Sequence, residues 1–133
     1  MPQATNLVIK NGAASPVDKT FTLIAPAAGD GGIAKWVLKE GTIAGAFPVL
    51  TASAQESASG AQRTLKVKFK LPSTYVDAVT GRTILAKPAA MNASFDLPSD
   101  FPEALKPDFA AYATNALKTA LLVEMIKDAY PAT

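Results

Sequence analysis

The chain has 133 residues, of which 49% are hydrophobic and 18% are charged, and its net charge is +2. This composition is typical of one folded domain, expected to span residues 1–133, and not of a disordered tail. The chain contains neither cysteine nor histidine, which excludes disulfides, cysteine nucleophiles, zinc sites built on these residues and a Ser-His-Asp relay.

The first part of the chain predicts short strands separated by turns. Asn11-Gly12 and Ser15-Pro16 are turn signals, and "GDGG" at 29–32 is another break. This glycine-rich stretch lacks the Lys-Ser/Thr and the helix that follow a phosphate-binding loop, so we interpret it as a turn. The strands are expected at residues 6–10, 19–25, 33–40 and 49–55.

The segment "TLKVKFKL", residues 64–71, alternates strictly between two kinds of side chain. Its apolar residues fall on one side of a strand and its lysines, with Thr64, fall on the other. The polar stretch "ESASGAQR" before it predicts a hairpin with the strand at 49–55, whose Thr51, Ser53 and Gln55 share one face. The sequence therefore predicts a sheet with one apolar face and one basic, hydroxyl-bearing face.

Residues 72–88 carry Pro, Thr-Gly and Lys-Pro signals and are predicted as a long loop, with strand at most at its edges. Alternation resumes at 89–97, where Asn92 and Asp96 share a face and Phe95 and Leu97 share the other. After Pro98 the period changes to about 3.6 residues.

We expect helix from this point to Pro131, broken into two. Ser99 or Asp100 is a candidate cap, with Pro102 in the first turn, and Pro107-Asp108 permits a restart. Several antiparallel strands followed by helices predict the α+β class, with the apolar helix faces on the apolar sheet face. Because so small a sheet leaves unpaired edges, we also expect a homodimer.

The acidic residues show no spacing that indicates catalysis, and helix capping accounts for Asp100 and Asp108. We expect no enzyme activity, no catalytic or metal-binding residues, no cofactor and no small-molecule substrate. No window approaches 18 uninterrupted apolar residues, and the N-terminal segment has no long apolar run, so neither a membrane span nor a secretory signal is expected. Synthesis in the cytoplasm is the default.

Four segments in this order resemble the coat proteins of single-stranded RNA bacteriophages, the leviviruses. They cover about residues 30–133 and are "GIAKWVL", the hairpin "VLTASAQESASGAQRTLKVKFKLP", "NASFDLP" and the C-terminal "ALLVEMIKDAYPAT". The resemblance implies an N-terminal β-hairpin, a five-stranded antiparallel sheet and two C-terminal helices. It also implies an intertwined homodimer, in which the helices of each chain reach over the partner's sheet.

The resemblance further implies an icosahedral capsid that packages single-stranded RNA in a virion made in the bacterial cytoplasm. The loop at 72–88 would correspond to the family's loop around the symmetry axes, which differs in conformation between shell positions. Family members also bind an RNA hairpin and so repress translation of the replicase gene.

The residues that would contact RNA lie on the basic sheet face. In the family motif, adenine pockets are formed by Thr and Ser on one strand, matched here by Thr51 and Ser53, and by Thr and Lys on the next, matched by Thr64 and Lys66. Asn92 matches an Asn that contacts the hairpin, but the aromatic residue two positions earlier is replaced by Ala90. Recognition of unstacked bases through hydroxyls, amides and phosphates is common among RNA-binding proteins. The full set of expected RNA-binding residues is Thr51, Ser53, Gln55, Thr64, Lys66, Lys68, Lys70 and Asn92.

Two alternatives remain open from the residues alone. The lysines could form a plain solvated strand face that prevents aggregation. The chain could also be a small dimeric nucleic-acid-binding module that forms no shell.

Overall fold

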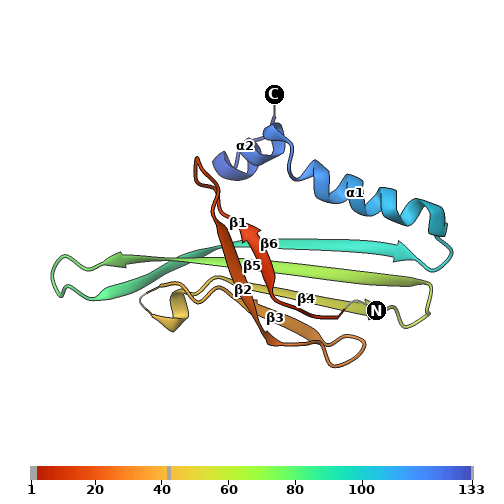
Figure 1. Ribbon diagram of the computed structural model, residues 1–133, viewed down its shortest axis with the longest axis horizontal. Coiled ribbons are helices and arrows are strands. Elements are labelled where there is room, and N and C mark those ends of the chain that lie inside the picture. The colour runs from red at the N-terminus through yellow and green to blue at the C-terminus, as the bar shows by residue number, and fades with distance from the viewer. Residues whose placement is uncertain (1–2, 42, 133) are drawn as a thin grey trace. The chain divides into compact units, whose positions relative to one another are not determined.

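The computed structural model describes residues 3–41 and 43–132. The chain divides into two compact units, residues 1–99 and 100–133, which are described separately. Strands followed by two C-terminal helices confirm the predicted α+β class (Figure 1). The elements in chain order are β1 (Leu7–Lys10), β2 (Asp18–Ala25), β3 (Ile33–Val37), η1 (Ala44–Ala46), β4 (Val49–Glu56), β5 (Gln62–Val76), β6 (Thr83–Pro98), η2 (Glu103–Leu105), α1 (Lys106–Ala116) and α2 (Ala120–Asp128).

The first unit is a single antiparallel sheet whose strands follow one another in chain order, β1-β2-β3-β4-β5-β6. The fold agrees with the expectation, but the strand count differs. A hairpin and five further strands were implied, whereas six strands form one sheet within the described residues. The N-terminal hairpin, β1 and β2, belongs to the same sheet as the four strands β3 to β6 that follow it.

The region 72–88 is mostly strand, which corrects the predicted long loop. β5 continues to Val76 and β6 begins at Thr83, and these two residues pair directly. Pro72 and Pro88 misled the prediction because proline cannot donate a ladder hydrogen bond. The sheet accommodates both at a register shift, where Leu71 pairs with Ala89 and Ser73 already pairs with Ala86. The extra residue on β6 is a bulge, which lets the strands continue beyond it.

The strand predicted at 33–40 is also shorter, because β3 ends at Val37. The N–H of Leu38 donates to the carbonyl of Pro48 at 3.0 Å, and Gly41 takes a φ of +142°. The chain then turns through η1 into β4.

The core of this unit lies on the apolar face of the sheet near the N-terminal hairpin. Phe21, Ala34 and Trp36 are buried there, and the rings of Phe21 and Phe69 lie 6.1 Å apart. The indole N–H of Trp36 donates to the backbone carbonyl of Thr5 at 2.7 Å, which ties the chain before β1 to β3. A buried Trp commonly satisfies its N–H in this way.

The second unit contains α1 and α2, and their division confirms the predicted break. The first helix begins at Lys106, with Pro107 in its first turn, and not at Ser99 or Asp100. Pro102 is extended, with a ψ of 130°, so the chain forms only the short η2 before α1. Among the described residues, no side chain caps the N-terminus of α1 or α2 with a hydrogen bond.

The second helix ends at Asp128, before the predicted stop at Pro131. Ala129 is left-handed, with a φ of 58°, and its N–H donates to Met125 at 2.8 Å, a common way to end a helix. Neither α1 nor α2 contains a buried residue in the single chain. Among the described residues, no helix has the length and apolar character needed to cross a membrane.

Candidate nucleic-acid interface

The basic face predicted from the sequence is formed by β3, β4, β5 and β6. Directly opposed residues in an antiparallel sheet share a face, so the register defines its rows. We call this surface the lysine face. From one end to the other its rows are Val37–Val49–Lys70–Ala90, Lys35–Thr51–Lys68–Asn92, Ile33–Ser53–Lys66–Ser94 and Gln55–Thr64–Asp96.

All the residues expected to contact RNA lie on this face. Thr51 and Ser53 are half-buried between their neighbouring strands, while the side chains of Gln55 and Asn92 are exposed. The lysines of β5 are exposed as well. Consecutive lysines lie two residues apart, so their Cα atoms are spaced by about 7 Å along the strand.

The register shows which of these residues lie opposite one another on β4 and β5. Thr51 is opposite Lys68 and Ser53 is opposite Lys66, so these side chains form one compact block. Thr64 lies one row further on, where its hydroxyl donates to the carboxylate of Asp96 at 2.8 Å. The structure therefore places Lys68, which was not among the residues matched to the family motif, directly opposite Thr51.

The electrostatics of the face are dominated by cations. Among the ion pairs of residues 3–41 and 43–132, none involves Lys66, Lys68 or Lys70. Of the two carboxylates on strands β3 to β6, Asp96 lies on the lysine face. Glu56 lies on the opposite face, where it is paired with Arg63. The positive charge of the face thus has little internal compensation.

Lys35 is a further member of the face that was not among the expected RNA-binding residues. It is exposed on β3 and lies directly opposite Thr51. The alternation of "IAKWV" was the signal available in the sequence: adjacent residues of a strand point to opposite faces, so a Trp36 on the apolar face puts Lys35 on the polar one.

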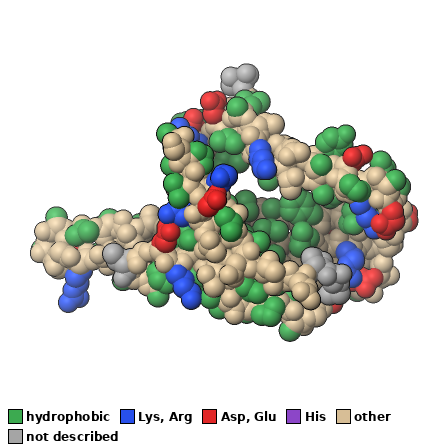
Figure 2. Space-filling view, in the orientation of Figure 1, with side chains coloured by type: hydrophobic (Ala, Val, Ile, Leu, Met, Phe, Trp, Pro, Cys, Tyr) green, Lys and Arg blue, Asp and Glu red, His purple; other side chains and the backbone are tan. Residues whose placement is uncertain are grey.

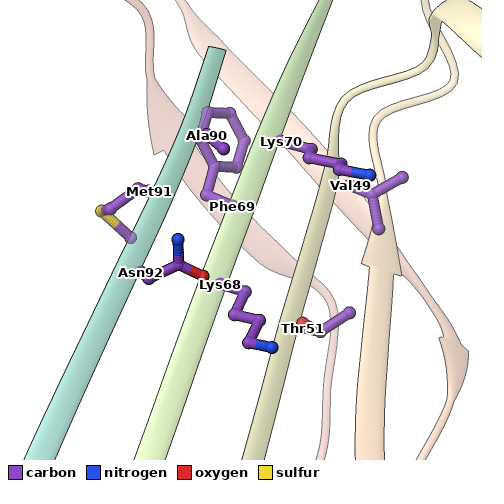
Figure 3. Close-up of a pocket in the computed structure, with 8 residues that line it drawn as sticks. All are labelled: Val49, Thr51, Lys68, Phe69, Lys70, Ala90, Met91 and Asn92. Atoms are coloured by element: carbon purple, nitrogen blue, oxygen red, sulfur yellow. The ribbon is translucent and has the colours of Figure 1, made fainter. Parts of the chain in front are cut away.

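A shallow hollow of about 250 Å³ lies at the Ala90 end of the face (Figure 3). In this view the side chain of Lys68 extends from β5 toward Thr51 on β4. The small side chain of Ala90 leaves open the space that an aromatic ring could occupy. The lining residues are Val49, Thr51, Lys68, Phe69, Lys70, Ala90, Met91 and Asn92.

The face offers the ammonium groups of the lysines, the hydroxyls of Thr51, Ser53 and Thr64, and the amides of Gln55 and Asn92. Within the described part of the chain, no group of three or more carboxylates could hold a metal ion. A clear pKa shift occurs elsewhere, in the turn after β5. There the backbone N–H of Val79 donates to the carboxylate of Asp77 at 2.8 Å and lowers the pKa of that carboxyl.

Comparisons with known proteins agree with this architecture. The model of the family described as levivirus coat protein matches residues 2–131. Among solved structures, a virus-like particle of bacteriophage NT-214 is similar with a TM-score of 0.84 and 23% identity, over 99% of this chain and 100% of that one. A virus-like particle of Beihai levi-like virus 21 is similar with a TM-score of 0.83 and 20% identity, over 99% of each chain.

The capsid protein of bacteriophage GA is also similar, with a TM-score of 0.71 and 17% identity, over 96% of this chain and 95% of that one. No curated protein matches the chain. At these identities the solved structures establish the fold, and the family match covers nearly the whole sequence.

Proposed function

This chain belongs to the levivirus coat protein family, and from that premise we propose that it dimerises and assembles into an icosahedral capsid that packages single-stranded RNA. The observation that supports RNA packaging is the lysine face. Its exposed lysines on β5 have no ion-pair partners among the described residues, so their charges are free to bind phosphates. We propose that this face points to the interior of the shell. The two units then serve as one coat protein domain with a structural role and no enzymatic one.

Dimer formation is supported by the surfaces that the single chain leaves open. β6 is a sheet edge of 16 residues, and a long unpaired edge is normally covered or paired with another chain. The helices also expose apolar side chains: Leu121 is 58% exposed and Ile126 is 67% exposed. A second copy supplies both a strand for the edge and an apolar surface for the helices.

RNA packaging is supported by the spacing and exposure of the lysines. Phosphates bound by lysines release condensed counterions, which favours binding at low salt and does not depend on sequence. Lys35 widens the positive surface from β5 to β3. The face is therefore suited to hold packaged RNA of many sequences.

We also propose that the same face binds an RNA hairpin and so represses translation of the replicase gene. The Thr51–Lys68 and Ser53–Lys66 pairs place hydroxyls beside cations, and Asn92 adds an amide next to Lys68. This combination is suited to unstacked bases and their phosphates. Because Ala90 provides no ring for stacking, the hairpin preferred by this protein differs from one selected by an aromatic at that position.

The competing function is a small dimeric nucleic-acid-binding module that forms no shell. Expression of the chain alone in bacteria, followed by a sizing column monitored at 260 and 280 nm, separates the two. A coat protein gives round particles in the void volume with high absorbance at 260 nm. A retained peak of dimer size would refute capsid assembly. We propose that the protein is made in the bacterial cytoplasm and functions in the virion.

A further inference from the structure

Asp96 is an anion on a surface whose other charges attract polyanions. It lies on the lysine face at the row Gln55–Thr64–Asp96, and its side chain is exposed. A carboxylate repels RNA phosphates, so Asp96 opposes the phosphate binding that the neighbouring lysines favour. Phosphate binding therefore does not account for a carboxylate at this position.

Elsewhere in the described chain, ion pairs with lysine or arginine hold several carboxylates. Figure 2 shows acidic side chains next to basic ones at several places on the side that it presents. The carboxylates in ion pairs are those of Asp18, Asp30, Glu40, Glu56 and Glu103. Asp96 forms no ion pair within residues 3–41 and 43–132, so its charge is available to another molecule.

The carboxylate of Asp96 is held in place by Thr64. The hydroxyl of Thr64, directly opposite on β5, donates to Oδ1 of Asp96 at 2.8 Å. The same hydroxyl lies 3.5 Å from Nε2 of Gln62, from which it accepts a hydrogen bond. Because the two oxygens of an ionised carboxylate have about four acceptor positions, both oxygens of Asp96 can still accept hydrogen bonds from a ligand.

The neighbours of Asp96 supply other groups that a nucleotide needs. Thr64 lies between Asp96 and Gln55 in its row, so the Cα atoms of Asp96 and Gln55 are about 10 Å apart. The side chain of Gln55 is exposed, and its amide can donate and accept. Lys66 is exposed two residues from Thr64 on β5, about 7 Å along the strand. An anionic acceptor, an amide and a cation thus lie within reach of a single nucleotide.

Guanine is the base whose edge matches these groups. Its Watson–Crick edge carries two neighbouring donors, N1–H and the 2-amino group, which can bind the two oxygens of one carboxylate, and its O6 accepts from an amide. Adenine and cytosine each place an acceptor beside their amino group, and uracil has one donor between two acceptors. A carboxylate, which only accepts, therefore favours guanine over the other three bases. Unstacked bases are commonly read at this edge.

We infer that Asp96 reads a guanine of the bound RNA: its carboxylate accepts N1–H and the 2-amino group, Thr64 positions that carboxylate, and Gln55 donates to O6. This inference rests on the proposed RNA binding of the lysine face. The lysines bind phosphates without regard to sequence, so Asp96 supplies a base preference that they lack. Where guanine is absent the carboxylate only repels the RNA, which increases the discrimination against other bases.

Inosine isolates the proposed contact, because it differs from guanosine only in lacking the 2-amino group. Fluorescence anisotropy measures the binding of unassembled protein to labelled oligouridines that carry one central guanosine or one central inosine. We expect the wild-type chain to bind the guanosine oligomer about five-fold more tightly, or better, as for other bidentate base contacts. Asp96→Asn should bring the two affinities within about two-fold of each other, because its amide has a donor in place of one acceptor. Asp100→Asn, which removes the same charge from the exposed turn after β6, is the matched control and should keep the preference.

The positioning role of Thr64 has its own pair of variants. Thr64→Ser keeps the hydroxyl and should keep the preference for guanosine, whereas Thr64→Val has no donor for Asp96 and should lose most of it. If Thr64 only packs within the sheet, these variants change stability and leave the ratio of the two affinities unchanged, which would overturn its positioning role.

The outcomes separate the inference from the function on which it rests. If the wild-type chain binds neither oligomer, RNA binding by the lysine face and the inference are both overturned. If it binds both equally, with affinities that fall as salt rises, only the reading of guanine is overturned. This comparison uses the wild-type chain, so it decides the inference even if Asp96→Asn does not fold. A preference that Asp96→Asn retains would overturn the assignment to Asp96, and one that is lost there but kept in Asp100→Asn supports it.

Discussion

Replacing Lys68 with Gln removes a central charge of the lysine face. Lys68 lies between Lys66 and Lys70 on β5 and faces Thr51 on one side and Asn92 on the other. Its side chain is exposed and forms no ion pair among the described residues. The substitution therefore leaves no buried charge without a partner, and we expect the fold to be unaffected.

The size of the effect follows from counterion release. Four lysines that each neutralise one phosphate of a single strand give a slope of log K against log salt of about −2.8, so affinity falls about 50-fold between 50 and 200 mM salt. With Lys68→Gln the slope becomes about −2.1. At 0.1 M salt the same reasoning predicts a loss of affinity of about five-fold.

The assay is fluorescence anisotropy of a labelled 12-nucleotide oligouridine, titrated with unassembled protein at several salt concentrations. Lys127→Gln, which removes the same charge from α2, is the matched control and should leave the slope unchanged. A slope near zero for the wild type, or equal slopes for the two variants, would refute the assignment of the lysine face to phosphate binding.

Three further predictions test the core, the turn and the hollow. Phe21 is only 5% exposed, so Phe21→Ala should lower the free energy of unfolding by about 3–5 kcal/mol, measured in urea by the intrinsic tryptophan fluorescence. The folded chain lowers the pKa of Asp77, so this carboxylate stabilises the turn above the pKa of the unfolded chain, about 4, and the stabilisation is lost as pH falls through the folded pKa. Hydrogen-exchange protection of the turn amides should decrease over that range, and Asp77→Asn should abolish the pH dependence. Ala90→Tyr places a ring in the hollow and should tighten oligouridine binding at least five-fold, consistent with about 1–3 kcal/mol per stacked base; an equal gain for Ser94→Tyr, further along β6, would contradict the role of the hollow.

The sequence predicted the strands best where polar and apolar residues alternate strictly. The segment 64–71 lies inside β5 as expected, and the face that carries its lysines is the one predicted. The prediction failed at Pro72 and Pro88, because local signals treat proline as a break. Whether a strand continues past a proline depends on its partner strand. Here a bulge on β6 interrupts the pairing at the two prolines, and the strands pair again beyond it.

The alternation of the sequence also predicted which residues lie on the lysine face, but it did not predict which of them lie opposite one another. Which residues lie directly opposite one another depends on the register, and one strand alone does not reveal it. The pairing of Thr51 with Lys68, and the bond between Thr64 and Asp96, emerged only from the structure. Lys35 was missed because its face depends on β3 joining the same sheet.

The central claim is that this chain forms a capsid with the lysine face directed at packaged RNA. The most direct measurement is a cryo-electron microscopy reconstruction of the particles that form when the chain is expressed alone in bacteria. We predict a closed icosahedral shell in which the surface of Lys66, Lys68 and Lys70 faces inward, with density for nucleic acid against it. A shell with this face outward, or a preparation that contains only dimers without nucleic acid, would contradict the account.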